Sequence, residues 1–197
     1  MLSNEAGAQP PAVCRRGRHV VVTEHLRLHS PSRSDWLIMA AAASDPGAQR
    51  WLGWPKRKVI AASRRDSLLT RRPGQGRMQP SWHGRQWFLI AVDRSSGMVA
   101  GGIGSDQADE VGGWLAPAYR GHRLVRELFS GAAHFAHYHL GEANVFAGTE
   151  PANVACVNAL LAAGFVPTKG PEQHHLPDGR RVPARWFVHQ ADSPTRC

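Results

Sequence analysis

The sequence predicts an α/β fold: a mixed central sheet of about six to seven strands flanked by helices. Three observations support this prediction. Short apolar runs with strand composition recur along the chain, and longer segments with helical spacing separate some of them. The apolar run at 110–115 is also joined to the run at 143–149 through one long helical segment. A strand–helix–strand connection of this kind places its two strands parallel in one sheet.

Length and composition are those of one globular domain. The chain has 197 residues, of which 42% are hydrophobic and 20% charged, enough for one complete core but marginal for two. Residues 19–190 are therefore predicted to form a single domain, between a disordered extension at 1–18 and a short tail at 191–197. No apolar run approaches the ~20 residues of a membrane span, and the N-terminus lacks the apolar region of a secretory signal.

The N-terminal half of the domain begins with a strand and a helix. A strand is predicted at 20–29, where leucine alternates with polar residues. Ser34 and Asp35 can cap a helix that begins with WLIM and ends at the Asp45-Pro46 break. The RWLGW segment that follows is predicted to contribute its apolar residues to the core, with the wall of a substrate pocket as the alternative. These residues are Trp51, Leu52 and Trp54.

The C-terminal half alternates strands with two helices. Continuous apolar runs predict buried strands, and apolar residues at helical spacing predict helices that pack on a sheet. The predicted strands are 87–93, 98–104, 110–115, 143–149 and 184–190. The predicted helices are 123–140, closed by Gly141, and VACVNALLAA, capped near Asn153 and closed by Gly164.

The chain is strongly basic, with a formal net charge of +9. One explanation is an anionic partner, such as a nucleic acid, a ribosomal surface or a phosphorylated cofactor. The other is compositional, because nearly all of the positive charge is arginine in an alanine- and glycine-rich chain. Residues 56–85 carry nine basic residues against the single acid Asp66. They are predicted to be largely a solvated loop, with a nucleic-acid-binding arm as the alternative.

Cysteine and histidine usage gives little support to a metal site. Three scattered cysteines argue against a disulfide framework and for a reducing, cytoplasmic protein. His134 and His137 share a helix face while His139 points elsewhere, and no carboxylate or cysteine completes a ligand set with them or with His174 and His175. The three helix histidines are predicted to be solvated, and no bound metal is expected.

The turn Arg120-Gly121-His122-Arg123-Leu124 lies between the strand at 110–115 and the helix at 123–140. The first amide groups of a helix lack internal partners, and the helix dipole favours negative charge there. A short basic turn with a glycine at this place is typical of an anion site. The sequence therefore predicts that a phosphorylated cofactor binds at this turn.

Two motifs around this turn resemble a known family. EVGGWLAPAYRGHRLVRELF, followed by TEPANVACVNALLAAGF, is similar to the GNAT (GCN5-related N-acetyltransferase) superfamily, and most of all to its RimJ/RimL-like branch. The matching positions are Glu110 to Pro117, Arg120 to Val125, Asn153, Cys156, and Gly164 with Phe165. The resemblance covers residues 20–190 loosely and 110–165 strongly. It implies an N-acetyltransferase that moves an acetyl group from acetyl-CoA to a primary amine of a small molecule or a protein N-terminus.

The resemblance also implies where acetyl-CoA lies. In this family two neighbouring parallel strands splay apart and hold the thioester between them. The pantetheine pairs with the strand before the turn, and the pyrophosphate binds the amides of the turn. The implied contact residues are Trp114, Leu115, Ala116, Arg120, Gly121, His122, Arg123, Leu124, Val125 and Asn153.

Arg123 and Val125 stand where the family has glycines. A side chain there crowds the pyrophosphate if the backbone needs a positive φ. If it does not, the amides stay available and Arg123 adds charge to the site. The alternative function is therefore a catalytically weak or inactive protein that binds CoA or has a regulatory role, and a nucleic-acid-binding module is a third hypothesis.

The resemblance implies three candidates for proton transfer. Leu160 replaces the tyrosine that many relatives use, and Cys156 replaces the serine of the RimJ/RimL-like branch. A thiol can protonate the departing thiolate, although Cys156 could instead be a small apolar residue on a buried face. Glu110 and Glu150 are the candidate bases, with a strand-end or helix-cap charge as the alternative for each. The acceptor amine and the oligomeric state stay open, and a homodimer is one possible assembly.

Overall fold

Seven strands form the largest of three sheets in this computed structural model, which describes residues 12–15, 18–55, 60–74, 82–83, 86–105 and 110–192. The strands are β1 (Ala12–Arg15), β2 (Arg18–Val22), β3 (Leu26–His29), β4 (Trp82–His83), β5 (Gln86–Asp93), β6 (Val99–Ser105) and β7 (Val111–Leu115). They are ordered β1-β2-β3-β5-β6-β7, with β4 paired to β5, and every pairing is antiparallel.

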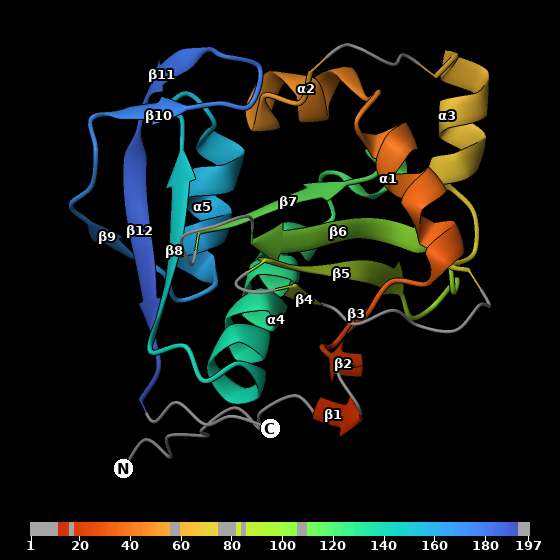
Figure 1. Cartoon of the computed structure of the whole chain (residues 1–197), viewed down its shortest axis with the longest axis horizontal. Helices are drawn as coiled ribbons and strands as arrows, with labels where there is room; N and C mark the ends of the chain where they lie inside the picture. Colours follow the sequence, from red (N-terminus) through yellow and green to blue (C-terminus); the bar gives the residue numbers. More distant parts are fainter. Residues whose placement is uncertain are drawn as a thin grey trace.

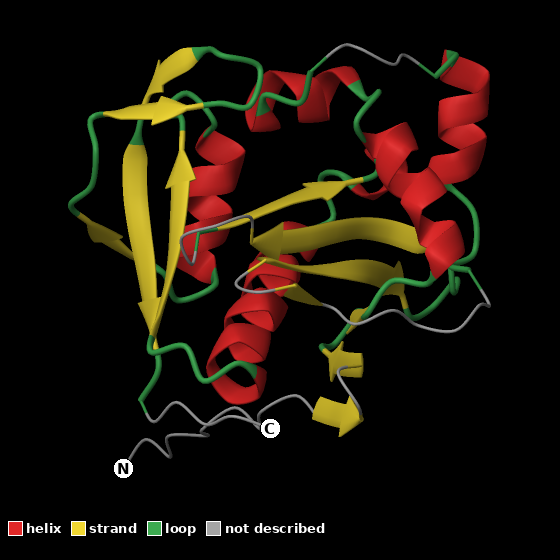
Figure 2. Ribbon diagram, viewed as in Figure 1, coloured by secondary structure: helices red, strands yellow, loops and turns green. Residues whose placement is uncertain are grey.

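Helices pack on both faces of this sheet (Figure 2). They are α1 (Trp36–Ala42), α2 (Pro46–Leu52), α3 (Ala62–Leu69), α4 (Leu124–His139) and α5 (Val154–Ala162), with short 3-10 helices η1 (Arg33–Asp35) and η2 (Pro117–Tyr119). Alternation along β5 separates two cores. Leu89 packs in the cluster that contains Leu128 of α4, whereas Ile90 packs with Ile38 of α1 and Leu69 of α3.

A smaller antiparallel sheet stands beside β7 (Figure 1). Its order is β8-β12-β9, and a β10-β11 hairpin lies above it. The bounds are β8 (Asn144–Thr149), β9 (Val166–Thr168), β10 (Gln173–His175), β11 (Arg181–Pro183) and β12 (Arg185–Gln190). One parallel bridge, from Glu110 to Phe146, connects the start of β7 to β8. The strand–helix–strand crossover β7-α4-β8 is therefore confirmed, but pairing among the described residues is mostly antiparallel and divided between sheets.

The N-terminal region differs from its prediction as a disordered extension followed by one strand. The predicted strand at 20–29 is a hairpin of β2 and β3, because the Thr23 amide donates to the Leu26 carbonyl at 2.9 Å and the Leu26 amide donates to the Thr23 hydroxyl at 3.1 Å. Residues 12–15 pair with β2 as β1. The rest of the extension, residues 1–11 and 16–17, and the tail from 193 lie outside the described residues.

The histidines of α4 are not solvated, contrary to the prediction. His137 and His139 are each 2% exposed, because β2 and β12 cover the C-terminal end of the helix with His19 and His189. The Nδ1 atoms of His19 and His139 lie 2.7 Å apart. Nε2 of His137 lies 2.9 Å from Nδ1 of His189, and its Nδ1 lies 2.6 Å from the Glu142 carbonyl. Each ring–ring contact in this buried histidine cluster needs one nitrogen that donates and one that accepts, so two charged rings cannot form it.

Glu127 ties the first turn of α4 to the β2–β3 turn. Its carboxylate accepts from the Thr23 hydroxyl, from the His25 amide at 2.8 Å and from the His25 ring at 2.6 Å. Burial alone raises the pKa of the Glu127 carboxyl, but these hydrogen bonds outweigh it, so that the net pKa is lowered. Glu127 is thus a buried anion, and its carboxylate oxygens accept hydrogen bonds from donors in the β2–β3 turn.

Substituting Glu127→Gln is expected to lower the free energy of unfolding by about 2 kcal/mol, because a buried charge-assisted hydrogen-bond set loses its charge. Urea denaturation at neutral pH measures the change. Glu24→Gln is the matched control, because Glu24 is exposed and its carboxylate lies 3.9 Å from the His25 ring, which is too far for a hydrogen bond. Equal effects of the two substitutions would contradict this role of Glu127.

The basic segment 56–85 is described only in part. Residues 62–69 form α3, and Leu69 anchors it in the core. Residues 56–59, 75–81 and 84–85 lie outside the described residues, so the solvated loop and the nucleic-acid-binding arm both stay predictions. In the part of the chain that the structure describes, every helix is too short or too polar to cross a bilayer.

Candidate active site

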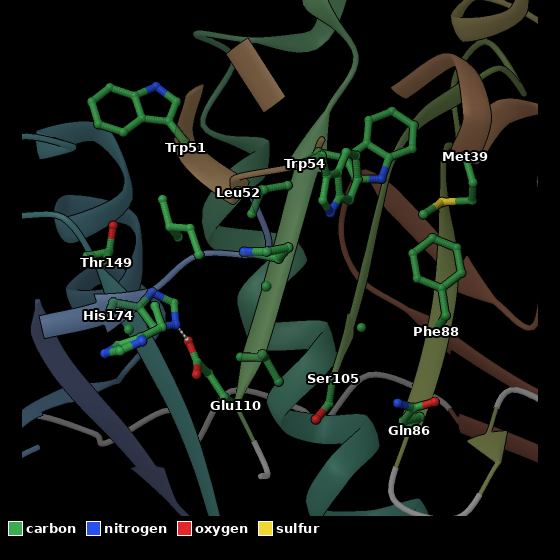
Figure 3. Close-up of a pocket in the computed structure, with 18 of the residues that line it drawn as sticks. Met39, Trp51, Leu52, Trp54, Gln86, Phe88, Ser105, Glu110, Thr149 and His174 are labelled. Carbon is green, nitrogen blue, oxygen red and sulfur yellow. Dashed lines mark ion pairs between the residues drawn. The ribbon is translucent and has the colours of Figure 1, made fainter. Parts of the chain in front are cut away.

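A pocket of about 820 Å³ opens between α1, α2, the strands β5 to β7, the end of β8 and the β10-β11 hairpin (Figure 3). Its walls are mainly apolar and aromatic. They include Trp36, Met39, Trp51, Leu52, Trp54, Trp87, Phe88 and Trp114. Two carboxylates also line it, from Glu110 and Glu150. A large apolar pocket with a few converging polar groups is the usual form of a substrate site.

Trp51, Leu52 and Trp54 all line this pocket, as the alternative prediction has it, while Leu52 and Trp54 also pack against the core. Trp51 is 38% exposed, and the other two are half-buried against the α1 cluster while also facing the pocket. The cause is local. Asp45 caps α2 by accepting from the Ala48 amide, and Gly53 ends the helix with a φ of 63°. This short helix therefore lies across the pocket mouth instead of packing wholly inside.

Glu110 enters the pocket from the start of β7, and Figure 3 shows its carboxylate directed at His174 of the β10-β11 hairpin. Oε1 of Glu110 lies 3.1 Å from Nε2 of His174. The His174 ring meets Trp186 edge-on, with centroids 5.4 Å apart. His174 is not among the site residues predicted from the sequence, so the structure adds it to the site. No local sequence signal links two residues so far apart in the chain.

Glu150 follows β8 and pairs with Arg50 of α2, with Oε2 and Nη1 2.7 Å apart. The Arg50 guanidinium lies over the Trp51 ring at 4.4 Å from its centroid. This stack fixes the arginine and leaves the carboxylate at the pocket edge. Both predicted carboxylates, Glu110 and Glu150, thus reach the same pocket.

The β10-β11 hairpin is fastened to α2. Nη2 of Arg180 donates to the carbonyls of Gln49 and Arg50, each at 3.0 Å, while Nε binds Asp178 at 2.7 Å. The arginine therefore satisfies carbonyls at the C-terminal end of the helix. The hairpin closes this side of the pocket and adds Leu176, Pro177 and Val182 to its wall.

Cys156 lies one layer behind the pocket, in the first turn of α5. Burial raises the pKa of its thiol, and a hydrogen bond with Thr149 offsets only part of that effect. Thr149 ends β8 and lines the pocket. The Asn153 side chain caps α5 by accepting from the Cys156 amide at 3.3 Å. Asn153 thus has a structural role at the place where the resemblance implies a cofactor contact.

The predicted anion turn precedes α4, a helix of 16 residues. Gly121 has a φ of 84°, and residues 121–123 are exposed. Arg123 is the N-cap residue with a φ of 59°, and it is the sole non-glycine residue of positive φ in the described ranges. The arginine side chain has no acceptor to cap the first amides of the helix. Leu124 is buried and Val125 packs against the α4 core, so both point away from the turn surface.

Arg120 holds the turn in place. Its Nη2 pairs with Asp45, the N-cap residue of α2, and its Nε donates to the Leu115 carbonyl at 3.1 Å. The neighbouring Ala116 amide donates to the Ala100 carbonyl at 2.9 Å. Trp114 is 6% exposed and lines the pocket from the opposite face of the strand to Leu115. Some of the residues predicted to contact acetyl-CoA therefore lie on the turn surface and some at the strand edge. Others bind partners inside the protein.

Replacing Arg123 with glycine is expected to raise the free energy of unfolding by about 0.5–1 kcal/mol, because a left-handed backbone strains any residue with a Cβ. Arg123→Ala is the matched control: it also removes the guanidinium but keeps the strain. Thermal and urea denaturation measure both variants. A glycine variant no more stable than the alanine variant would show that the positive φ carries no strain.

The comparisons with known proteins agree with the fold. Residues 25–166 match the acetyltransferase (GNAT) domain family, whereas the sequence matches no curated protein. A spermidine N-acetyltransferase from Vibrio cholerae, solved with CoA and spermine, has a TM-score of 0.66 at 12% identity and covers 87% of this chain and 98% of its own. RimL, a ribosomal alpha-N-protein acetyltransferase solved with CoA, has a TM-score of 0.64 at 15% identity over 87% and 97%.

A ribosomal-protein-alanine acetyltransferase from Vibrio fischeri is also similar, with a TM-score of 0.59 at 15% identity over 88% of this chain and 97% of that one. These structures share the α/β fold with this protein, and the family match comes from its sequence. Because that match spans 25–166 of 197 residues, the protein belongs to the GNAT family of acetyltransferases, as the motifs at 110–165 predict.

Proposed function

We propose that the protein transfers an acetyl group from acetyl-CoA to a primary amine held in the pocket. One observation carries the proposal: a single pocket gathers Glu110 from β7, Glu150 from the end of β8, and Thr149 with Cys156 behind it. The only pairing between β7 and β8 in the described residues is the bridge at Glu110. Beyond that bridge the two parallel strands are free to diverge around the thioester.

The turn before α4 suits the pyrophosphate of CoA. Residues 121–123 are exposed, a Cβ at Gly121 would meet nothing within 4 Å, and no side chain from the N-cap occupies the first amides of the helix. These amides and the helix dipole would hold the anion. Along β7, the Ala116 amide already serves β6, so strand alternation leaves the Leu115 amide for the pantetheine.

The positions of three side chains support a proposal for the proton transfers. An ammonium acceptor first loses one proton to solvent through Glu110. Its neutral nitrogen then attacks the thioester carbon, a C–N bond forms, and the C–S bond breaks. The Glu110 carboxylate takes a proton from the amine, and His174 holds that carboxylate in place at 3.1 Å. The Cys156 thiol, kept protonated by its raised pKa, lies behind the pocket and would give a proton to the leaving thiolate through the Thr149 hydroxyl, its hydrogen-bond partner in the pocket wall. Solvent then returns the proton from Glu110 to Cys156, so the protein is unchanged.

Isothermal titration with acetyl-CoA, followed by a thiol-release assay with a panel of primary amines, tests the proposal. Binding and amine-dependent release of free CoA are the expected results. No binding at millimolar acetyl-CoA would overturn it. Binding without release for any amine would favour the second candidate, a catalytically weak CoA-binding protein, which the arginine in a strained position of the turn supports.

A further inference from the structure

The Glu110 carboxylate lies across the pocket from part of its apolar wall. In Figure 3, Glu110, His174 and Thr149 lie on one side with Trp51, and Met39 and Phe88 lie on the other with Gln86. A Cβ placed on Gly148 would lie 3.0 Å from Oε1 of Glu110, so this carboxylate rests against the same strand end that leads to Glu150. An amine acceptor would therefore put its nitrogen at the β8 side and its remaining groups against the aromatic wall.

The charges of the pocket suit an acceptor with one positive charge. Glu110 and Glu150 are the only acidic or strongly basic residues that line the described pocket. Each already has a partner, His174 at 3.1 Å and Arg50 at 2.7 Å. An acceptor with three or four ammonium groups would have to lay the others against tryptophan, methionine and leucine, where each lacks a counter-charge.

The aromatic wall has the area and the exposure to hold an apolar group. Trp36 is 54% exposed and Trp51 38%, although both side chains line the pocket. Covering them with an apolar group removes apolar area from water and brings favourable ring contacts. The hairpin fastened by Arg180 closes one side with Leu176, Pro177 and Val182, so the wall is apolar there as well.

From this arrangement we propose that the acceptor is a primary monoamine that carries an aromatic or bulky apolar group next to the amine-bearing carbon. The inference rests on the proposed acetyl transfer and narrows its substrate class. Two sources share this chemistry: a free arylalkylamine, and a peptide whose N-terminal residue is aromatic. The experiment has an arm for each.

The test measures kcat/KM of the full chain at saturating acetyl-CoA with three acceptors: 2-phenylethylamine, a short peptide that begins with phenylalanine, and spermidine. At least one aromatic acceptor is expected to exceed spermidine by about ten-fold or more, the range that a well-fitted apolar group gives. Turnover with spermidine at an equal or higher kcat/KM would overturn the inference and leave acetyl transfer intact. Failure of all acetyl-CoA binding would instead overturn the proposed function.

A pair of variants on α1 separates a role of the wall from a change in stability. Trp36→Ala is expected to raise KM for the preferred aromatic acceptor by about ten-fold, because the ring loses its contact. Leu37→Ala is the matched control: Leu37 is also 54% exposed but does not line the pocket. Equal effects of the two would overturn the inference. If no acceptor turns over, calorimetric titration of CoA-bound protein with 2-phenylethylamine and the peptide decides, and the absence of binding by both overturns it.

Discussion

Lowering the pH from 7 to 5 is expected to reduce the free energy of unfolding by about 2 kcal/mol for each of His19 and His139. Burial lowers the pKa of both rings from 6.5 to about 4. Their Nδ1 atoms are 2.7 Å apart, so one ring donates and the other accepts, and two charged rings cannot keep this bond. Burial also lowers the pKa of His29, His134 and His189, which act in the same direction.

The direction in which the free energy of unfolding changes with pH follows from proton uptake on unfolding. Between pH 6.5 and about 4 the unfolded chain binds protons at His19 and His139, whereas the folded chain does not. The stabilisation is therefore complete above pH 6.5, is lost as the pH falls, and levels off below the folded pKa of about 4. Urea denaturation between pH 7.5 and pH 5 measures it in a window where most carboxylates keep their charge. A stability curve that is flat over this window would contradict the prediction.

Two variants assign the pH dependence of stability to individual histidines. His139→Asn keeps an uncharged hydrogen-bonding group near the position of Nδ1 and is expected to flatten the pH dependence. His25→Asn has the opposite sign, because the hydrogen bond with Glu127 raises the pKa of His25. That contribution is present in acid and is lost as the pH rises through the folded pKa, so removing it should steepen the acid loss.

The regions predicted well from the sequence are those governed by nearby residues. Helix α4 was predicted at 123–140 and runs from Leu124 to His139 because its apolar stripe and closing glycine are local features. The strand β5 and the Asn153 cap were predicted for the same reason. The β2–β3 hairpin and the three-residue strands β9, β10 and β11 were not, since pairing with distant strands defines them and three residues carry no periodicity.

In the candidate site, too, residues placed by local motifs were predicted, and their partners from distant elements were not. Glu110 and Glu150 were placed by motif, and both reach the pocket. Their partners His174 and Arg50 come from elements far away in sequence, where no spacing rule applies. The resemblance implies that Arg120 contacts the cofactor, and in the structure its guanidinium pairs with Asp45. The sequence shows that a residue is charged, whereas the choice between ligand and internal partner depends on the packing of α2.

Replacing Glu110 with glutamine is expected to lower kcat for acetyl transfer by about 10²–10⁴-fold, the usual contribution of a positioned proton acceptor. The amide keeps the size of the side chain and can still contact His174, 3.1 Å away in the native protein, but it cannot take a proton. The affinity for acetyl-CoA should be unchanged, because Glu110 lies at the opposite end of β7 from the turn before α4. Steady-state kinetics with the best acceptor and calorimetry with acetyl-CoA measure the two quantities.

Glu150→Gln is the matched control, and it separates the two candidate bases. Glu150 is held by Arg50 at 2.7 Å, so its carboxylate is already engaged in an ion pair at the pocket edge. This variant should raise KM for the amine more than it lowers kcat, because it removes the carboxylate charge of Glu150 that attracts the ammonium group to the pocket. The rate of the Glu110 variant should recover partly at high pH, where free amine no longer needs a base. A larger loss of kcat in Glu150→Gln would transfer the role of base to Glu150.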